Sequence, residues 1–404
     1  MKKRIFLDYA SITPLEKQVK AEIERVEKVA WANPSSLHSY GDKAKTALEE
    51  ARVKIAKLLH CRSSEIYFTS GGTESLNTVI FGVFHKMKKQ VPLPHIIVSS
   101  IEHPAVLEPI KFMLKRGKIE ASFISPNEKG IISPDSVARE LKQNTILVVV
   151  QHANNEIGVI QPIAKIASMI KQNRKAPPQP LPKGEGLLPY FLVDASQSAL
   201  YENVSLERLR ADMLVIDGIK IYGPRGAGVL VVRHGTEIEP IIFGGGQENG
   251  LRSGTENVPA AAGLAKALEL ARRRCEKESK RLKQLRDYAI GKILKEIPNA
   301  SLNGSLENRL PNNINICLAS PKSLTKAGFP IIDSEFLVIK LDTLGFAVSA
   351  ASACSSLNLE NGSYVIESLG RSECKNYSLR ITLGLETKKQ DLDKLIVALK
   401  KNLN

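Results

Sequence analysis

The stretch Ala211–Gly228, ADMLVIDGIKIYGPRGAG, decides the fold and directs the search for function. Its apolar run Met213–Ile216 has the length of a buried strand, and a second apolar run, Val229–Val232, follows a turn rich in glycine and proline. Lys220 lies between the two runs. A lysine held where water is scarce has a lowered pKa, and its neutral amine can form a Schiff base with a carbonyl group. On this stretch alone, a lysine that extends to solvent from a strand end is the commoner arrangement.

Length and composition describe an ordinary soluble protein with a large core. The chain has 404 residues, of which 43% are hydrophobic and 25% are charged, and this length favours two domains, with three as the alternative. The first apolar run, Ile5–Leu7, is too short for the core of a signal peptide, and no apolar run approaches membrane-spanning length. We therefore expect a cytoplasmic protein.

The net charge of +15 is compatible with an acidic partner protein or with RNA. Because no RNA-binding motif and no basic patch with interleaved aromatic residues occurs, a solvated lysine-rich surface is the favoured interpretation. The five cysteines are scattered and show neither CxxC nor Cys/His zinc spacing, so no resident metal site is expected. Four of them are interpreted as buried small hydrophobic side chains: Cys61, Cys275, Cys317 and Cys374.

Strand-length apolar runs alternate with helical patterns through the first 232 residues. Strands are expected at 65–69, 96–99, 119–124, 146–150, 190–193, 213–216 and 229–232, with helices between most of them. Such repeated units indicate an α/β fold with a mostly parallel sheet covered by helices. Residues 176–189, with five prolines and two glycines, interrupt the pattern and are interpreted as a surface insertion.

Polar residues follow the carboxyl ends of these expected strands. Parallel sheets bind ligands at that edge, so the accumulation predicts a binding site there. The turn Ser70–Glu74, which precedes a helical pattern, can bind phosphate through free backbone N–H groups and the helix dipole, although such turns are common elsewhere. The residues concerned are Gly72, Thr73, His103, Asn155, Asp194, Gln197 and Lys220.

The pattern changes after Val232. A long helical pattern begins near Pro259, and strands near 312–317 and 378–382 with helices near 334–344 and 390–400 indicate a mixed α+β region. We predict a large domain of residues 15–258 and a smaller α+β domain formed by residues 1–14 together with 259–404.

Ten motifs occur in the order of a known family: LDYASITP, NPSSLH, FTSGGTES, EHPAVL, HANNEIGVIQ, VDASQS, KIYGPRGAG, GGGQENGLRSGT, SAASACSS and SLRITLG. Nearly the whole chain resembles the pyridoxal-phosphate-dependent cysteine desulfurases of the class V aminotransferase family. The likeness is greatest to the branch that supplies sulfur for iron–sulfur clusters and tRNA thiolation. The resemblance implies a fold-type I homodimer with the cofactor in the large domain, near the subunit interface.

The resemblance assigns five residues to the cofactor's ring. Lys220 would be the Schiff-base lysine, and Asp194 would pair with the pyridinium nitrogen, so that the ring acts as an electron sink. Gln197 and Asn155 would hold the ring's phenolic oxygen. His103 would stack on the ring and share in proton transfer.

Other motifs would bind the phosphate and the substrate. Gly72 and Thr73 would bind the phosphate at their helix N-terminus, and Thr255 would reach it from the other subunit. Arg380 would clamp the substrate carboxylate with its planar set of donors. Asn33 lies in a motif that lines the substrate side.

Cys354 matches the family's nucleophile, in a loop of small residues that suits a mobile thiolate. The implied reaction starts when Lys220 removes the Cα proton of bound L-cysteine. Cys354 then takes the substrate sulfur as a persulfide, and L-alanine leaves. The acceptor would be an iron–sulfur scaffold protein or a tRNA thiolase, with no membrane and no direct nucleic-acid contact. Cys354 would also be able to ligate a nascent cluster transiently.

The chain departs from the family just before the lysine. Family members commonly carry Ser-Gly-His there, where this chain has Asp217-Gly218-Ile219. Ile219 has no side-chain donor, and a carboxylate would repel the phosphate. We expect Asp217 to turn away, leaving Thr73, the helix N-terminus and Thr255 to bind the phosphate; weaker cofactor binding or an altered reaction is the alternative. The stretch after Cys354 is also slightly longer than in the family.

Three other functions stay open. Selenocysteine lyase or another class V pyridoxal enzyme is the alternative among enzymes, and the nucleophilic cysteine favours the desulfurase. A homologue that lacks the cofactor and acts as a scaffold or sulfur-relay partner is the alternative outside enzymes. The change at Asp217 and Ile219 is its support. Salt-dependent RNA binding is a weaker third hypothesis.

Overall fold

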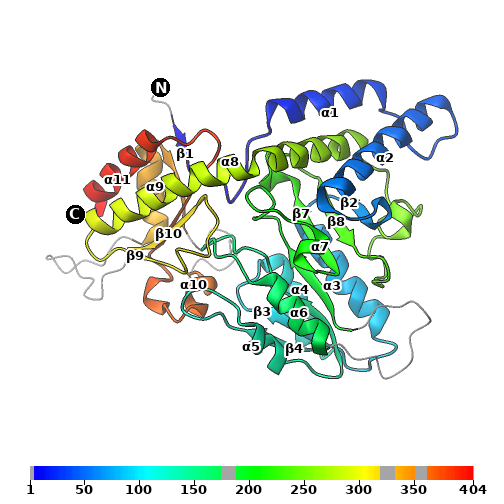
Figure 1. Ribbon diagram of the computed structural model, residues 1–404, viewed down its shortest axis with the longest axis horizontal. Coiled ribbons are helices and arrows are strands. Elements are labelled where there is room, and N and C mark those ends of the chain that lie inside the picture. The colour runs from blue at the N-terminus through cyan, green and yellow to red at the C-terminus, as the bar shows by residue number, and fades with distance from the viewer. Residues whose placement is uncertain (1–3, 174–187, 319–332, 351–361, 404) are drawn as a thin grey trace.

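The computed structural model describes residues 4–173, 188–318, 333–350 and 362–403. A seven-stranded sheet and a four-stranded sheet form the two main parts of the molecule (Figure 1). Cys354 and nearly all of the predicted insertion at 176–189 lie outside the described residues.

The large sheet contains all seven strands predicted in the first 232 residues. Its order is β2-β8-β7-β6-β5-β3-β4, and β7, β6, β5, β3 and β4 are mutually parallel, whereas β8 is antiparallel to both of its neighbours. The predicted mostly parallel α/β sheet is therefore confirmed. The bounds are β2 Ile66–Thr69, β3 His95–Ser99, β4 Glu120–Ile124, β5 Thr145–Val149, β6 Tyr190–Asp194, β7 Met213–Asp217 and β8 Gly228–Val232.

Both faces of this sheet are buried. In β7, Leu214 and Ile216 belong to one hydrophobic cluster, while Met213 and Val215 belong to another. Successive side chains of a strand point to opposite faces, so a strand covered on both sides is apolar throughout. This explains why the run Met213–Ile216 shows no alternation with polar residues.

Helices cover the sheet on either side (Figure 1). The Met213 side packs against α3 Gly72–Met87 and α4 Pro104–Lys115. The Leu214 side packs against the remaining helices of the large part. These are α1 Lys17–Val29, α2 Ser39–Leu59, α5 Pro134–Arg139, α6 Ile163–Asn173, α7 Leu206–Leu209 and part of α8 Val258–Glu296.

Helix α8 connects the two parts. Its 39 residues contact α1 and α2 on the large part and α11, Lys389–Leu403, on the small part. Figure 1 shows it running along one side of the molecule, from the large part to the small part. The long helical pattern predicted from Pro259 into the 290s is thus one continuous helix.

The four-stranded sheet is antiparallel, in the order β12-β13-β10-β9. Near it, β1, Ile5–Phe6, pairs in parallel with β11, Phe346–Ala347, so that the first residues of the chain pack on its C-terminal part. This pairing agrees with the predicted grouping of residues 1–14 with 259–404, although the domain boundaries themselves stay a prediction. The remaining bounds are β9 Ser301–Leu302, β10 Asn313–Cys317, β12 Ser349–Ala350, β13 Ser378–Thr382, α9 Ser334–Thr343 and α10 Tyr364–Ser368.

Two cysteines differ from their predicted state. Cys317, at the end of β10, and Cys374 form a disulfide, so their interpretation as separate buried thiols is wrong. The antiparallel pairing of β10 with β13 brings these residues together across 57 positions of sequence, which spacing alone does not reveal. Cys61 and Cys275 are free and half-buried. Burial raises the pKa of Cys61 to about 12 and also raises that of Cys275, which agrees with unreactive thiols.

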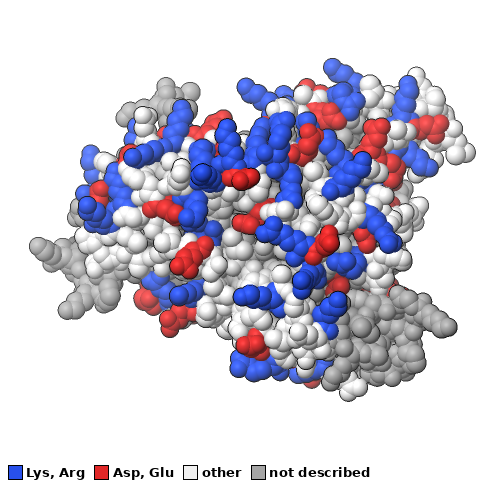
Figure 2. All heavy atoms as spheres, in the orientation of Figure 1, with Lys and Arg blue, Asp and Glu red and all other residues white. Residues whose placement is uncertain are grey.

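Charged side chains are mixed over the visible face of the molecule (Figure 2). Lysine and arginine lie across this whole face with aspartate and glutamate among them, so the view shows no single basic patch. Among the described residues, the helices include none of the length and apolar character needed to cross a membrane.

Candidate active site

The structure brings most predicted site residues to one edge of the large sheet. Gly72 opens α3 after β2, and His103 precedes α4 after β3. Asp194 ends β6, and Lys220 closes the short helical turn Gly218–Lys220 that follows β7. Asn155 and Gln197 lie in the turns after β5 and β6. Because these strands point the same way, their carboxyl ends meet at this edge.

The N-terminal segment Asp8–Ser11 holds the lysine. The Nζ of Lys220 donates to the carbonyl oxygens of Ala10, at 2.8 Å, and Ser11, at 2.6 Å. The Nε2 of Gln197 donates to the same Ala10 oxygen at 2.9 Å. The segment therefore fixes both side chains. Sequence reasoning recognised the motif but missed this role, because the contacts use backbone atoms.

Asp194 and His103 interact next to the lysine. Burial raises the pKa of Asp194, and a hydrogen bond from the backbone N–H of Ser196, at 2.9 Å, opposes the rise. Burial lowers the pKa of His103, Asp194 opposes this change, and Lys220 adds to it. The Nδ1 of His103 accepts the N–H of Ala105 at 3.1 Å and caps α4. His103 is therefore neutral near pH 7, with its proton on Nε2.

Arg380 reaches the same segment from the small sheet. It is 1% exposed in β13, and its Nη2 donates to Asp8 Oδ1 at 2.9 Å and Ser11 Oγ at 2.8 Å. Its Nη1 donates to the carbonyl of Asn155 at 3.1 Å. The buried Nε has no hydrogen-bond partner among the described residues. The guanidinium thus lies beside the lysine's support, with a donor left for an incoming carboxylate.

Asp217 points toward the predicted phosphate position in this structure, instead of turning away from it as expected. Its Oδ2 accepts the N–H of Gly72, the first residue of α3, at 2.9 Å. Its Oδ1 accepts the N–H of Ile219 at 3.1 Å. Free N–H groups and the positive end of the helix dipole attract a carboxylate to a helix N-terminus. Sequence reasoning considered repulsion from the phosphate and overlooked this attraction, which operates without a cofactor.

Several predicted residues lie apart from this cluster. Asn33 is exposed in the loop between α1 and α2, where its Oδ1 accepts the N–H of Ser35 at 2.9 Å. Thr73 and Thr255 are exposed in the single chain. An ion pair at 2.8 Å between Arg252 and Glu74 nevertheless ties the segment before Thr255 to the first turn of α3. The roles of Asn33, Thr73 and Thr255 stay predictions.

Two buried carboxyl groups beside the site were missed from the sequence. Glu102 precedes His103, and burial raises its pKa well above the usual range. Burial raises the pKa of Glu156 to about 7, although Ser363 donates to its Oε2 at 2.5 Å. Ser363 caps α10, close after the segment that carries Cys354. Glu156 therefore joins the sheet edge to the chain that leads from Cys354. Their neighbours His103 and Asn155 drew attention first, and burial could not be read from the motifs.

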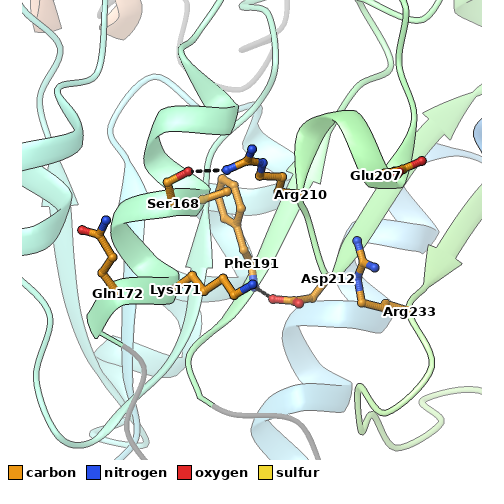
Figure 3. Close-up of a pocket in the computed structure, with 9 residues that line it drawn as sticks. Ser168, Lys171, Gln172, Phe191, Glu207, Arg210, Asp212 and Arg233 are labelled. Atoms are coloured by element: carbon orange, nitrogen blue, oxygen red, sulfur yellow. Dashed lines mark hydrogen bonds between the residues drawn. The ribbon is translucent and has the colours of Figure 1, made fainter.

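A separate surface pocket lies at the opposite edge of the sheet (Figure 3). There the Nη1 of Arg210 donates to the hydroxyl of Ser168 at 2.8 Å, and the N–H of Phe191 donates to the carboxylate of Asp212 at 2.8 Å. Asp212 directly precedes β7, whereas Lys220 follows it. The pocket and the lysine therefore lie at opposite ends of one strand, and the pocket is not part of the candidate active site.

A mostly parallel α/β sheet with a lysine, an aspartate and a histidine at its carboxyl edge defines the class of fold-type I pyridoxal-phosphate enzymes. The chain belongs to the family Aminotransferase class-V, whose sequence pattern matches residues 5–395. This confirms the family predicted from the ten motifs.

Relatives and solved structures agree with this assignment. The chain is 42% identical over 394 residues to cysteine desulfurase IscS of Dictyoglomus turgidum, covering 97% of this chain and 93% of that protein. It is 40% identical to cysteine desulfurase IscS 1 of Archaeoglobus fulgidus, covering 98% and 95%. A solved NifS-like protein superposes with a TM-score of 0.86 at 29% identity, over 98% of each chain. A structure titled SspA in complex with cysteine gives 0.74 at 31% identity, over 94% and 98%.

Pyridoxal 5′-phosphate is the cofactor of this family, as the motifs predicted. The residues at the lysine end fit it: an amine on Lys220, a partly buried carboxyl on Asp194 and a neutral imidazole on His103 lie together. At the N-terminus of α3, where the phosphate is predicted to bind, the N–H of Gly72 already has a partner in Asp217. The side chains at the Lys220 end therefore match groups of the cofactor, whereas the backbone donor at the α3 end is already occupied by Asp217.

Proposed function

We propose that the protein is a cysteine desulfurase that converts L-cysteine to L-alanine and retains the sulfur as a persulfide on Cys354. The convergence of Lys220, Asp194, His103 and Arg380 around the segment Asp8–Ser11 carries the proposal. Its support is the near full-length similarity to proteins named cysteine desulfurase IscS.

Lys220 moves the proton at the substrate Cα. When bound, pyridoxal phosphate supplies an electron sink for the pair left by that proton. The two carbonyl groups of Ala10 and Ser11 fix the position of the amine, so that little reorganisation is needed during the reaction. Asp194 would pair with the ring nitrogen and favour its positively charged form, since burial makes the carboxylate costly without a cation beside it. His103 offers its Nε2 proton from a ring whose orientation α4 fixes.

Arg380 binds the substrate carboxylate. Its guanidinium is buried and already touches Asp8, so a second carboxylate shares the charge and gains the Nε–H. A bidentate contact with a planar guanidinium fixes orientation as well as position. Binding at Arg380 therefore directs the substrate Cα toward Lys220.

The sulfur step transfers one atom and needs no external oxidant. The thiolate of Cys354 attacks the substrate sulfur, forming an S–S bond as the Cβ–S bond breaks. The electron pair of the broken bond stays with the substrate carbon, which takes up a proton and becomes the methyl group of alanine. One cysteine and one enzyme thiol thus give one alanine and one persulfide. An acceptor protein, an iron–sulfur scaffold or a tRNA thiolase, then receives the sulfur in the cytoplasm.

The active form is proposed to be a homodimer. Leu37 is 99% exposed and Phe243 is 81% exposed, and Trp31 and Tyr40 are exposed nearby in the α1–α2 loop region. A shared hollow lined by Pro34, Ser35 and Gly245–Asn249 shows that the loops of Leu37 and Phe243 are neighbours. Exposed apolar side chains grouped in this way are typical of subunit interfaces. Thr255 precedes Glu256, which lines the same hollow, in agreement with a role that needs a second subunit.

A cofactor-deficient scaffold is the second candidate function, and the contact between Asp217 and Gly72 favours it. The two candidates differ in chemistry, because only the enzyme releases alanine from L-cysteine.

The test is the release of alanine and sulfide from L-cysteine in the presence of a reductant and pyridoxal phosphate. We expect turnover by the wild type and loss of it in Cys354→Ala, with Cys61→Ala as the matched control that keeps activity. Selenocysteine is the second substrate in the test. If the protein is a selenocysteine lyase, Cys354→Ala should remain active on selenocysteine. A wild type that releases no alanine would refute the proposal.

A further inference from the structure

Two side chains flank the first residue of α3, a helix of 16 residues. The Oδ2 of Asp217 accepts the N–H of Gly72 at 2.9 Å. A Cβ placed on Gly72 would lie 3.1 Å from that oxygen and 3.6 Å from the Oγ of Ser196. The N-terminus of α3 is therefore a small polar cradle with a carboxylate already in it.

Ser196 gives an independent indication that this cradle accepts a ligand. Its side chain is 7% exposed, and its Oγ has no hydrogen-bond partner of good geometry among the described residues. It nevertheless lies close enough to Asp194 to help lower that residue's pKa. A buried hydroxyl without a good partner costs free energy that a bound oxygen can recover. A helix N-terminus with a donor beside it suits an anion.

We propose that Asp217 is an internal anion that occupies the phosphate position at α3 in the cofactor-free protein, and that pyridoxal phosphate binds by displacing it. The identity of the ligand rests on the proposed function. Asp217 then sets the affinity for the cofactor and reduces the preference for the phosphorylated over the unphosphorylated aldehyde.

Competition follows from charge and hydrogen bonding. The carboxylate and the phosphate need the same N–H group, and two anions at one site repel each other. Displacing Asp217 also gives up its contact with the N–H of Ile219. Arg252 reaches the first turn of α3, but its charge is already paired with Glu74 at 2.8 Å. An entering phosphate therefore meets a net cost that pyridoxal, with a neutral hydroxymethyl group, avoids.

The experiment compares cofactor affinity across variants of the full chain after removal of bound cofactor. Pyridoxal phosphate and pyridoxal are titrated separately, and the near-visible absorbance of the Lys220 condensation product reports binding. The variants are Asp217→Asn, which keeps the shape without the charge, and Asp217→Ser. Asp212→Asn is the matched control, because Asp212 also accepts a backbone N–H, at 2.8 Å, but at the opposite edge of the sheet.

We expect Asp217→Asn and Asp217→Ser to bind pyridoxal phosphate at least about tenfold more tightly than the wild type. Pyridoxal affinity should change less than about twofold, and Asp212→Asn should match the wild type for both aldehydes. Unchanged affinity for pyridoxal phosphate in both Asp217 variants would overturn the inference. An equal gain for pyridoxal would also overturn it.

Calorimetric titration with inorganic phosphate provides a readout that does not depend on Lys220. Asp217→Asn should bind phosphate at least about tenfold more tightly than the wild type and Asp212→Asn. If no protein condenses with either aldehyde, the proposed function fails, and the phosphate titration still decides the inference. A gain in Asp217→Asn supports it, and no gain overturns it.

Discussion

The two ends of the candidate site sit on the same sheet edge but are prepared for a ligand in opposite ways. At the lysine end, the carbonyl groups of Ala10 and Ser11 hold Lys220 in place, and Asp194 lies beside His103. At the α3 end, Asp217 occupies the helix N-terminus itself. The side chains at the lysine end are placed to bind a cofactor. At the α3 end, the backbone N–H of Gly72 already has an acceptor in Asp217. Polar residues can therefore converge at one sheet edge while some of their hydrogen-bond donors are already occupied.

The largest effect is expected at the lysine end. Lys220→Ala should lower alanine formation by about 10²–10⁴-fold, because the amine that moves the Cα proton is lost. It should also abolish the near-visible absorbance, while the folded structure, measured by circular dichroism, persists. Lys171→Ala, in the pocket at the opposite edge, is the matched control and should keep full activity. Equal activity of the wild type and Lys220→Ala would contradict the role of the Lys220 amine in moving the Cα proton.

A smaller loss is expected when the charge of Asp194 is removed. Asp194→Asn should lower kcat by about 10²–10³-fold, since a neutral amide no longer stabilises a positive ring nitrogen. The absorbance maximum of the bound cofactor should shift, which a purely structural role would not produce. A normal spectrum together with normal kcat would show that the lysine end does not depend on this carboxylate.

Arg380 tests whether the substrate is held next to the lysine. Arg380→Lys keeps the charge but loses the planar donors, and we expect KM for L-cysteine to rise about tenfold or more with a smaller change in kcat. The matched control is Arg371→Lys, whose side chain contacts Ser301 and Asn303 instead of the site. An effect confined to kcat would assign Arg380 to chemistry instead of binding.

The smallest effect concerns stability and pH. Burial raises the pKa of Glu156 to about 7 in the folded protein, above the usual value of a glutamate. The folded state therefore binds this proton more tightly than the unfolded state, and the associated stability is lost as pH rises from about 4.5 to about 7. Glu156→Gln should remove this loss, which amounts to no more than about 3 kcal/mol of unfolding free energy across the whole pH range.

Urea unfolding at pH 5 and pH 8 measures this difference. The free energy of unfolding of Glu156→Gln, relative to that of the wild type, should be higher at pH 8 than at pH 5. Glu140→Gln, a partly exposed carboxyl that accepts from Ser122, serves as the control and should leave the slope unchanged. A slope in Glu156→Gln equal to that of the wild type would contradict the buried, protonated carboxyl.

Much of the fold could be predicted because burial leaves a direct pattern in the sequence. The runs Met213–Ile216 and Ile146–Val150 are apolar throughout, since helices cover both faces of the sheet. Alternation of strands and helices then places Lys220, Asp194 and His103 at one edge. The short strands β9, β11 and β12, of two residues each, have too little pattern to be predicted.

The features that could not be predicted depend on backbone atoms, or on contacts between residues far apart in the sequence. The contacts of Lys220 with Ala10 and Ser11 use backbone carbonyl groups across more than half the chain. The disulfide of Cys317 with Cys374 depends on strand pairing in the small sheet. The contact of Asp217 with the N–H of Gly72 joins residues 145 positions apart, and no motif indicates it.

The most direct test of the central claim is to locate the sulfur after one turnover without reductant. Wild-type protein loaded with pyridoxal phosphate is mixed with L-cysteine and digested, and mass spectrometry finds the peptide that gains one sulfur atom. We predict that the peptide containing Cys354 carries it, in an amount equal to the alanine formed, while Cys61 and Cys275 do not. Alanine formation without sulfur on Cys354, or sulfur on another cysteine of the wild type, would contradict the account.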